Sequence, residues 1–308
     1  MGYKDFLQLD SPPSKEEVVC TFRVEQDPSV EFSWAAGALA AESSIGTWDP
    51  GLTTMTDEAR KYGARVIKMD EAKKLVWVAY PQSLFEAGNL AQLLSSVVGN
   101  VYGLKEVRKL RFADIEMPAG FVRSFRGPQV GFEGVRKMTG IRDRPILGTI
   151  IKPKLGLSAE AWSDAAYKAW KGGVDFVKDD ENLTDMVFNR FDKRAELVIA
   201  AKKKAERETG EKKLYFSNIS APVTEMKRRA QKVVDLGNEY VMIDILTVGW
   251  SAVQENLVLA EIDVDDLRLE VEPVRHSADP PGGVVPQRLR AAASSGCELA
   301  YSSIGTFF

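Results

Sequence analysis

Apolar and polar residues alternate in short runs along the first part of the chain. Two of these runs, joined by the polar turn at residues 70–73, are typical of a β-hairpin. The complete predicted order is strand, helix, two strands, helix and strand, over residues 16–26, 31–43, 64–69, 74–81, 86–100 and 104–117. This β-α-β-β-α-β order is the split arrangement of a ferredoxin-like α+β domain, which we expect over residues 1–125.

After residue 125 the pattern changes to short apolar strands that alternate with longer amphipathic helices. Strands are predicted over residues 146–153, 174–180, 213–219 and 240–248, with helices over 158–173, 190–208 and 224–237. Such alternation is typical of a parallel sheet or of an α/β (TIM-type) barrel. Four strands cannot close an eight-stranded barrel, so residues 126–250 are predicted to form an incomplete one.

Residues 251–308 break this rhythm. They contain an acidic stretch, a Pro-Pro-Gly-Gly turn, an Arg-rich patch and an Ala/Ser run, and only 257–262 and 267–272 resemble strands. We therefore expect this divergent tail not to supply the missing strands and helices. An abrupt change of this kind is typical of a truncated or frameshifted gene product, and the alternative is a new tail that replaces the second half of the barrel.

Composition narrows the class of protein. The 308 residues have a net charge of -3 and are 28% charged, a balance that indicates neither nucleic-acid nor membrane binding. No apolar run is long enough to span a bilayer and no apolar signal core is seen, so we expect a cytoplasmic protein. Cys20 and Cys297 are too few for a disulfide framework or a multi-cysteine zinc site, and we expect both to be buried or inert thiols.

Two lysines follow the first predicted strand of the second domain. Lys152 and Lys154 are two residues apart across a proline, so in an extended conformation their side chains point to the same face. Two converging ammonium groups suit a phosphate or a developing oxyanion. The alternative is a pair of solvated lysines in a loop.

A second charged group follows the next strand. Lys178 and Asp180 share a face by alternation, and Glu181 stands at the strand exit. Oxygen ligands of this kind suit Mg²⁺, and the lysine would act either as a cation or, after reaction with CO₂, as a carbamate that adds a third anionic ligand. The alternative is that Asp179, Asp180 and Asn182 cap the following helix.

Five segments, taken together and in order, resemble the large subunit of ribulose-1,5-bisphosphate carboxylase/oxygenase. These are AAESSIGTW (40–48), GNVYGLKEVRKLRF (99–112), GTIIKPKLGLS (148–158), GGVDFVKDDEN (172–182) and MIDILTVGW (242–250). The segments from residue 215 onward look more like archaeal than plant versions of that family. The resemblance ends near residue 250.

The resemblance implies a role for each matching residue. Lys178 would be the carbamylated lysine and would complete a Mg²⁺ site with Asp180 and Glu181, with CO₂ as the activating group. Lys152 would act on the enediolate and protonate a product, and Lys154 would support it electrostatically. The remaining matches are Glu42, Asn100, Thr47 and Trp48. They would reach the active site of a neighbouring subunit, Thr47 and Trp48 beside a substrate phosphate. The resemblance therefore implies at least a homodimer.

The implied activity is Mg²⁺-dependent enolisation of ribulose 1,5-bisphosphate and addition of CO₂, giving two 3-phosphoglycerates, in nucleotide salvage. Family members also use two histidines, an arginine, a mobile-loop lysine and phosphate-binding serine and glycines from the second half of the barrel. This chain has one histidine, His276, in an unrelated context. We therefore expect no activity from the chain by itself. The alternatives are a carboxylase-like enolase or isomerase and an inactive truncated fragment.

Overall fold

A computed structural model of the chain describes residues 2–46, 55–125, 132–258 and 268–271. The chain divides into two compact units, residues 1–125 and 126–308, and each has its own apolar core. Within the described residues, no helix combines the length and the apolar composition that crossing a membrane requires.

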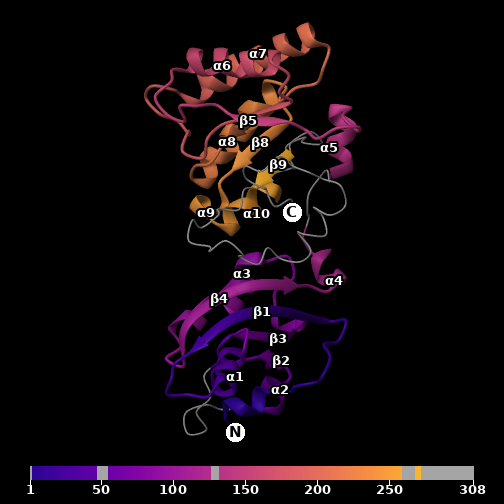
Figure 1. Ribbon diagram of the computed structural model, residues 1–308, viewed down its shortest axis with the longest axis vertical. Helices are drawn as coiled ribbons and strands as arrows, with labels where there is room; N and C mark the ends of the chain where they lie inside the picture. Colours follow the sequence, from indigo (N-terminus) through magenta and orange to yellow (C-terminus); the bar gives the residue numbers. More distant parts are fainter. Residues whose placement is uncertain (1, 47–54, 126–131, 259–267, 272–308) are drawn as a thin grey trace. The chain divides into compact units, whose positions relative to one another are not determined.

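The first unit is built on a four-stranded antiparallel sheet (Figure 1). Its strands are β1 (Glu17–Gln26), β2 (Arg65–Asp70), β3 (Leu75–Pro81) and β4 (Val107–Glu116), in the spatial order β2-β3-β1-β4. The helices are η1 (Tyr3–Phe6), α1 (Phe32–Glu42), α2 (Asp57–Arg60), η2 (Gln82–Leu84), α3 (Leu90–Val98), η3 (Asn100–Gly103) and α4 (Ala119–Val122). This order and pairing confirm the predicted ferredoxin-like arrangement.

The core of the first unit follows from the alternation in β1 and from the apolar helix α1. Every second residue of β1 from Val18 to Val24 is fully buried, as strand geometry requires of a sheet with one face toward a core. Helix α1 buries almost all of its residues and packs against η1. The contact needs glycine at position 37, because a Cβ there would lie 2.1 Å from the carbonyl oxygen of Tyr3.

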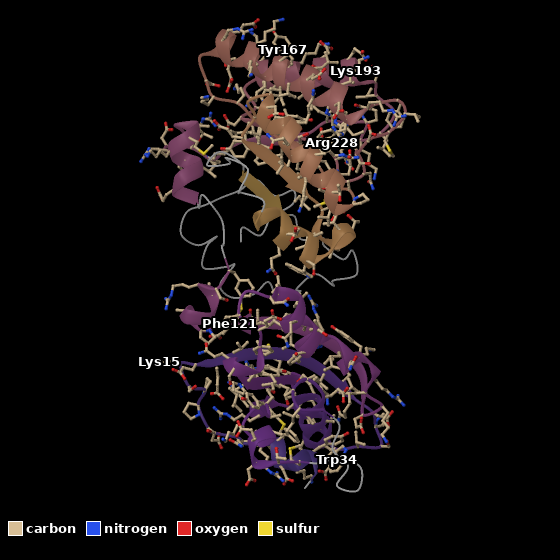
Figure 2. The ribbon with its side chains drawn as sticks, turned by 180° about the vertical axis from the view of Figure 1, so that it is seen from behind. Lys15, Trp34, Phe121, Tyr167, Lys193 and Arg228 are labelled. Carbon is tan, nitrogen blue, oxygen red and sulfur yellow. The ribbon has the colours of Figure 1, made fainter. Side chains whose placement is uncertain are left out.

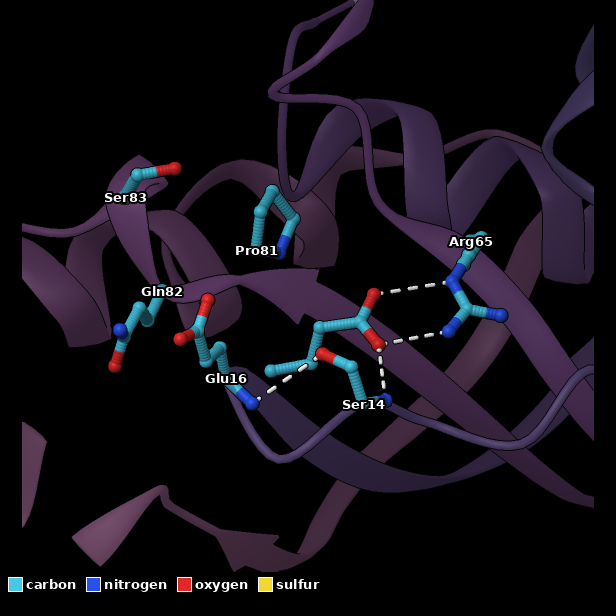
Figure 3. A pocket seen from close by; sticks show the side chains of 7 residues that line it. Ser14, Glu16, Arg65, Pro81, Gln82 and Ser83 are labelled. Carbon is cyan, nitrogen blue, oxygen red and sulfur yellow. Dashed lines mark hydrogen bonds and ion pairs between the residues drawn. The ribbon is translucent and has the colours of Figure 1, made fainter. Parts of the chain in front are cut away.

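A hollow of about 420 Å³ lies beside the start of β1 and the end of β3 (Figure 3). Its charged wall is an ion pair in which Arg65 donates from Nε and Nη2 to the two carboxylate oxygens of Glu17, at 3.0 and 2.7 Å. Arg65 also donates to the carbonyl oxygens of Ser11 and Pro12. None of the residues expected to carry chemistry lines this hollow, so we assign it a structural role.

The Glu17–Arg65 pair predicts a pH-dependent contribution to stability. Burial raises the pKa of Glu17, but the hydrogen bonds from Arg65 and Ser14 outweigh it, so the pKa lies below its ordinary value. A carboxyl with a lowered folded-state pKa stabilises the fold above its unfolded pKa of about 4.3, and this contribution is lost as the pH falls through the folded value. We expect Glu17→Gln to lower the melting temperature at neutral pH, with the difference from wild type vanishing in acid.

The control is Glu16→Gln, which changes an exposed neighbour in the same hollow. Melting curves of the three proteins between about pH 3 and pH 7 would check this. If the melting temperature of Glu17→Gln stays as far below that of wild type in acid as at neutral pH, the assignment is contradicted.

The second unit is a parallel sheet with helices between the strands (Figure 1). Its strands follow one another in space as they do along the chain: β5 (Gly148–Ile150), β6 (Phe176–Lys178), β7 (Leu214–Asn218), β8 (Tyr240–Ile243) and β9 (Arg268–Val271). The helices are α5 (Phe132–Thr139), α6 (Ala159–Lys171), α7 (Phe191–Thr209), α8 (Val223–Asp235), α9 (Ile245–Val248) and α10 (Trp250–Val258). The four predicted strand and helix units are all present.

Helices α6, α7 and α8 pack side by side, and ion pairs join their exposed faces (Figure 2). Lys193 of α7 pairs with Glu160 of α6. Arg228 of α8 pairs with Asp192 of α7 at 3.0 Å. Exposed pairs of this kind contribute at most about 1 kcal/mol each, so the buried apolar faces of the helices hold the layer together.

The predicted strand over 240–248 is wrong in its second half. Strand β8 ends at Ile243, and α9 begins at Ile245. The carboxylate of Asp244 accepts a hydrogen bond from the backbone N–H of Leu246 at 3.3 Å and so caps this short helix. An apolar run alone does not distinguish a strand from a buried helical turn.

The expectation that residues 251–308 do not supply the missing strands and helices is wrong in part: helix α10 spans Trp250–Val258, and β9 lies within the strand-like run at residues 267–272. Helix α10 buries Ala252 and Val253 in the core of the second unit, and β9 pairs with β8 in parallel register. Strand β9 is the last strand of the sheet that the structure describes and is paired on one side. Strand β9 has four residues, Arg268–Val271, in which apolar and charged residues alternate.

Candidate active site at the carboxyl ends of the strands

Lys178 is the last residue of β6 and lies at the centre of the candidate site. Its side chain is 2% exposed. The Nζ atom donates to Oε1 of Glu181 at 2.5 Å and lies 3.4 Å from Sδ of Met242, a residue of β8. A lysine this deeply buried needs a charge partner, and Glu181 supplies it because the chain turns back directly after β6.

The two lysines after β5 reach the same loop. Nζ of Lys152 donates to Oδ2 of Asp180 at 2.9 Å, and Nζ of Lys154 donates to Oδ1 of Asn182 at 2.7 Å. Strands β5 and β6 are parallel neighbours, with Ile150 paired to Lys178. This confirms the prediction that the Lys152–Lys154 and Lys178–Glu181 segments meet at the carboxyl ends of adjacent strands. The strand itself ends at Ile150, so the two lysines project from a loop.

The charge balance decides what this site can hold. The amines of Lys152 and Lys178 pair with the carboxylates of Asp180 and Glu181, and the amine of Lys154 adds a further positive charge beside Asn182 of the same loop. In the part of the chain that the structure describes, no group of three His, Cys, Asp or Glu side chains gathers around a possible metal position. Conversion of Lys178 to a carbamate would replace a cation by an anionic oxygen donor and give three such donors, a set that fits Mg²⁺.

Asp179 points away from these residues into a buried polar cluster. It is fully buried and accepts hydrogen bonds from Nε of Arg194 (3.1 Å), Oη of Tyr215 (2.9 Å) and Nε1 of Trp162 (3.1 Å). Arg194 is also fully buried; burial lowers its pKa, but its charge interactions and hydrogen bonds with Asp179 and Tyr215 together outweigh this effect, so the pKa of Arg194 is raised. Burial and the same charge raise the pKa of Tyr215, which therefore remains a donor.

The alternative that Asp179, Asp180 and Asn182 cap the following helix is wrong. Helix α7 does not begin until Phe191, and the carboxylate that accepts from its first N–H belongs to Asp185, at 2.8 Å. The carboxylate of Asp180 instead accepts from the N–H of Asn182 at 3.2 Å within the loop. The acidic residues after β6 therefore face the site or the buried cluster.

Two of the residues expected to reach the active site of a neighbouring subunit lie in described parts of the first unit. Glu42 is the last residue of α1, and Asn100 is the first residue of η3. Thr47 and Trp48 lie outside the described residues, as do His276 and Cys297. Cys20 is buried, which agrees with the expectation of a buried or inert thiol, and burial raises the pKa of this thiol.

Pattern analysis missed four residues of the buried cluster: Trp162, Arg194, Tyr215 and Asn218. Each lies within a predicted helix or strand, where the pattern indicates only core positions. One signal was present for Arg194, because it stands three residues after Phe191 on the apolar face of α7. A charged residue on that face needs a buried partner, and Asp179 is that partner.

Comparison with known proteins matches both units. Residues 5–121 match the N-terminal domain of the ribulose bisphosphate carboxylase large chain, and residues 131–262 match its catalytic domain. An octameric ribulose-1,5-bisphosphate carboxylase/oxygenase from Pyrococcus horikoshii is 39% identical, with a TM-score of 0.84 over 94% of this chain and 70% of that one. This chain belongs to the ribulose bisphosphate carboxylase large-chain family.

Other members of the family are similarly close. The ribulose bisphosphate carboxylase of Methanosarcina barkeri is 44% identical over 276 residues, which is 89% of this chain and 64% of that protein. A dimeric archaeal Rubisco from Hyperthermus butylicus is 42% identical, with a TM-score of 0.83 over 90% of this chain and 64% of that one. The predicted resemblance to archaeal members is confirmed.

The chain spans about two thirds of the length of the curated relatives it matches, 64% in the case of the Methanosarcina barkeri protein. The catalytic-domain match runs to residue 262, past the boundary near residue 250 that the sequence pattern predicted. It includes all of helix α10, in agreement with the packing of that helix in the core.

Proposed function

We propose that this chain is a ribulose-1,5-bisphosphate carboxylase large chain whose 308 residues carry the carbamate-forming and metal-binding part of the active site. The observation that carries the proposal is the position of buried Lys178. The Lys178 amine donates to the carboxylate of Glu181, and the carboxylate of the preceding residue, Asp180, accepts from the Lys152 amine. Family membership supports the same assignment.

Carbamate formation is a reaction of the neutral Lys178 amine with CO₂. The nitrogen lone pair forms a bond to the carbon of CO₂, one C–O π pair moves onto oxygen, and the nitrogen loses a proton to solvent. The side chain thereby changes from a cation to an anion beside Asp180 and Glu181. These three side chains would hold Mg²⁺, which supplies positive charge to stabilise negative charge developing on the substrate oxygens.

In a complete active site, the same residues would act on the substrate. The Lys178 carbamate would take the C3 proton of ribulose 1,5-bisphosphate, and the resulting enediolate carbon would bond to CO₂. Water would then add, and cleavage between C2 and C3 would give two 3-phosphoglycerates. Lys152 would donate a proton to the product carbanion, and Lys154 would stabilise negative charge beside it.

We propose that the first unit serves the site of a neighbouring copy. Glu42, Asn100 and the Thr47–Trp48 pair would bind substrate there, so a homodimer or a larger homo-oligomer is needed. Solved relatives titled as octameric and as dimeric support this. The archaeal relatives also lead us to place the reaction in nucleotide salvage.

The proposal is tested by Mg²⁺-dependent capture of CO₂. The chain is incubated with ¹³CO₂ with and without Mg²⁺, the carbamate is trapped by alkylation of its oxygen, and the modified lysine is located by mass spectrometry. We expect one labelled carbamate per chain, on Lys178, only with Mg²⁺. Label on no lysine, or spread over exposed lysines, would overturn the proposal.

Turnover by the chain alone is a separate prediction. We expect no measurable fixation of radiolabelled CO₂ with ribulose 1,5-bisphosphate and Mg²⁺, because the rest of the relatives' length is absent from these residues. Each missing acid, base or charged group costs on the order of a hundredfold or more in rate. A full-length archaeal relative assayed in parallel is the positive control. Turnover by this chain that Lys178→Met abolishes would contradict the prediction.

A further inference from the structure

We propose that Asn218 is a positioning residue that holds the metal-binding carboxylates of Asp180 and Glu181 in place. Asn218 is the last residue of β7 and is fully buried. Among the described residues, the hydrogen bonds of its side chain go to backbone groups. It acts on the backbone that carries the two carboxylates, and the inference rests on the function proposed above.

The side-chain amide of Asn218 faces three carbonyl groups of one loop. Nδ2 lies 3.2 Å from the carbonyl oxygen of Asp180, 3.0 Å from that of Glu181 and 3.3 Å from that of Leu183. The orientation of the amide is fixed, because Oδ1 accepts a hydrogen bond from the backbone N–H of Ser220 at 3.0 Å. One side chain thus supplies the donor for most of the turn after β6.

The backbone of Asn218 also bonds to the segment that follows β6. Its N–H donates to Oδ2 of Asp179 at 3.1 Å, and residue 218 pairs with Met242 in the sheet. Met242 in turn lies 3.4 Å from Nζ of Lys178. Asn218 therefore connects the loop of the two carboxylates to β7 and β8, on the side of the sheet away from β5.

Removal of this amide takes one donor from each of three carbonyl groups; that of Asp180 keeps the N–H of Leu183 at 2.9 Å, and that of Leu183 keeps Nη2 of Arg194 at 3.4 Å. Because losing a hydrogen bond to a carbonyl group in the protein interior is costly, the loop is expected to shift until water or another donor replaces the amide. Such a shift moves the backbone at Asp180 and Glu181. Groups that orient metal ligands from behind typically change metal affinity about 10- to 100-fold when they are removed.

The chain offers a matched control in Asn238. This residue is 2% exposed, and its Nδ2 donates to the carbonyl oxygens of Tyr215 and Tyr240 at 3.0 and 2.8 Å. Its Oδ1 accepts from Nζ of Lys202 at 2.9 Å. It precedes β8, so it lies at the amino ends of the strands, opposite the site.

The experiment compares Asn218→Ala with Asn238→Ala in the full chain. The first readout is the Mg²⁺ concentration that gives half-maximal ¹³CO₂ capture on Lys178, and the second is the melting temperature. We expect both variants to melt at lower temperature, while Asn218→Ala alone raises the half-maximal Mg²⁺ concentration, by about tenfold or more. Equal changes in Mg²⁺ response, or none in Asn218→Ala, would overturn the proposal.

Hydrogen exchange separates this proposal from the proposed function. We expect Asn218→Ala to accelerate exchange in a peptide that covers residues 180–183, and Asn238→Ala to leave that peptide unchanged. If the wild-type chain captures no CO₂, the proposed function fails, and the exchange result alone decides whether Asn218 positions the loop. The milder Asn218→Ser, which keeps one donor, is expected to give a smaller change of the same sign and serves if Asn218→Ala does not fold.

Discussion

Replacing Lys178 by methionine is expected to abolish Mg²⁺-dependent capture of CO₂ by this chain, from one carbamate per chain to none. Methionine keeps most of the volume of the buried side chain and removes the reactive nitrogen. The carbamate supplies the third anionic oxygen donor, so Asp180 and Glu181 alone are expected to bind Mg²⁺ more weakly by at least tenfold. Mass spectrometry of the alkylated carbamate and titration with Mg²⁺ check the two results.

Lys202→Met is a demanding control for this experiment. Lys202 is 6% exposed, and burial lowers the pKa of its amine. A neutral amine is the form that reacts with CO₂, so Lys202 is predisposed to the reaction, although its amine donates to the amide oxygen of Asn238 and not to a carboxylate. We expect Lys202→Met to capture CO₂ as the wild type does. Carbamate on Lys202, or capture that survives Lys178→Met, would show that a buried amine and not the Lys178 site is responsible.

The architecture of both units could be predicted from the sequence because their strands and helices have clear periods. The alternation in β1 and the spacing of apolar residues in α6, α7 and α8 each indicated one type of element. Helix α9 was not predicted, and β9 appeared only as the strand-like run at residues 267–272. Both are four residues long, and a run that short has no period of its own.

The sequence predicted which residues of the candidate site face one another, but not which residues hold them in place. Lys152, Lys178 and Asp180 stand in two segments that follow adjacent parallel strands, so topology alone brings them together. Asp179 and Asn218 depend on contacts between β6 and β7 that no spacing in the sequence encodes. Short polar residues at a strand exit are equally typical of a helix cap, and only the position of α7 excludes that interpretation.

Replacing Arg194 by methionine is expected to lower the free energy of unfolding by about 3–5 kcal/mol, because it leaves the carboxylate of Asp179 buried without its cation. The guanidinium also donates to the carbonyl oxygens of Asn189 and Thr184, at 3.1 and 2.8 Å, so these groups lose their donor as well. Urea unfolding followed by fluorescence or circular dichroism measures the change.

Arg229→Met is the matched control, because Arg229 is also buried and its guanidinium lies over the same Phe191 ring, at 5.1 Å against 5.5 Å for Arg194. Its partner Glu225 is 35% exposed, so water can solvate that carboxylate when the arginine is removed, and we expect a loss of about 1 kcal/mol. The double variant Asp179→Asn with Arg194→Met removes the buried charge and should recover about 1–3 kcal/mol relative to Arg194→Met alone. Equal losses in Arg194→Met and Arg229→Met, with no recovery in the double variant, would mean that shape and not the buried charge pair stabilises the loop between β6 and α7.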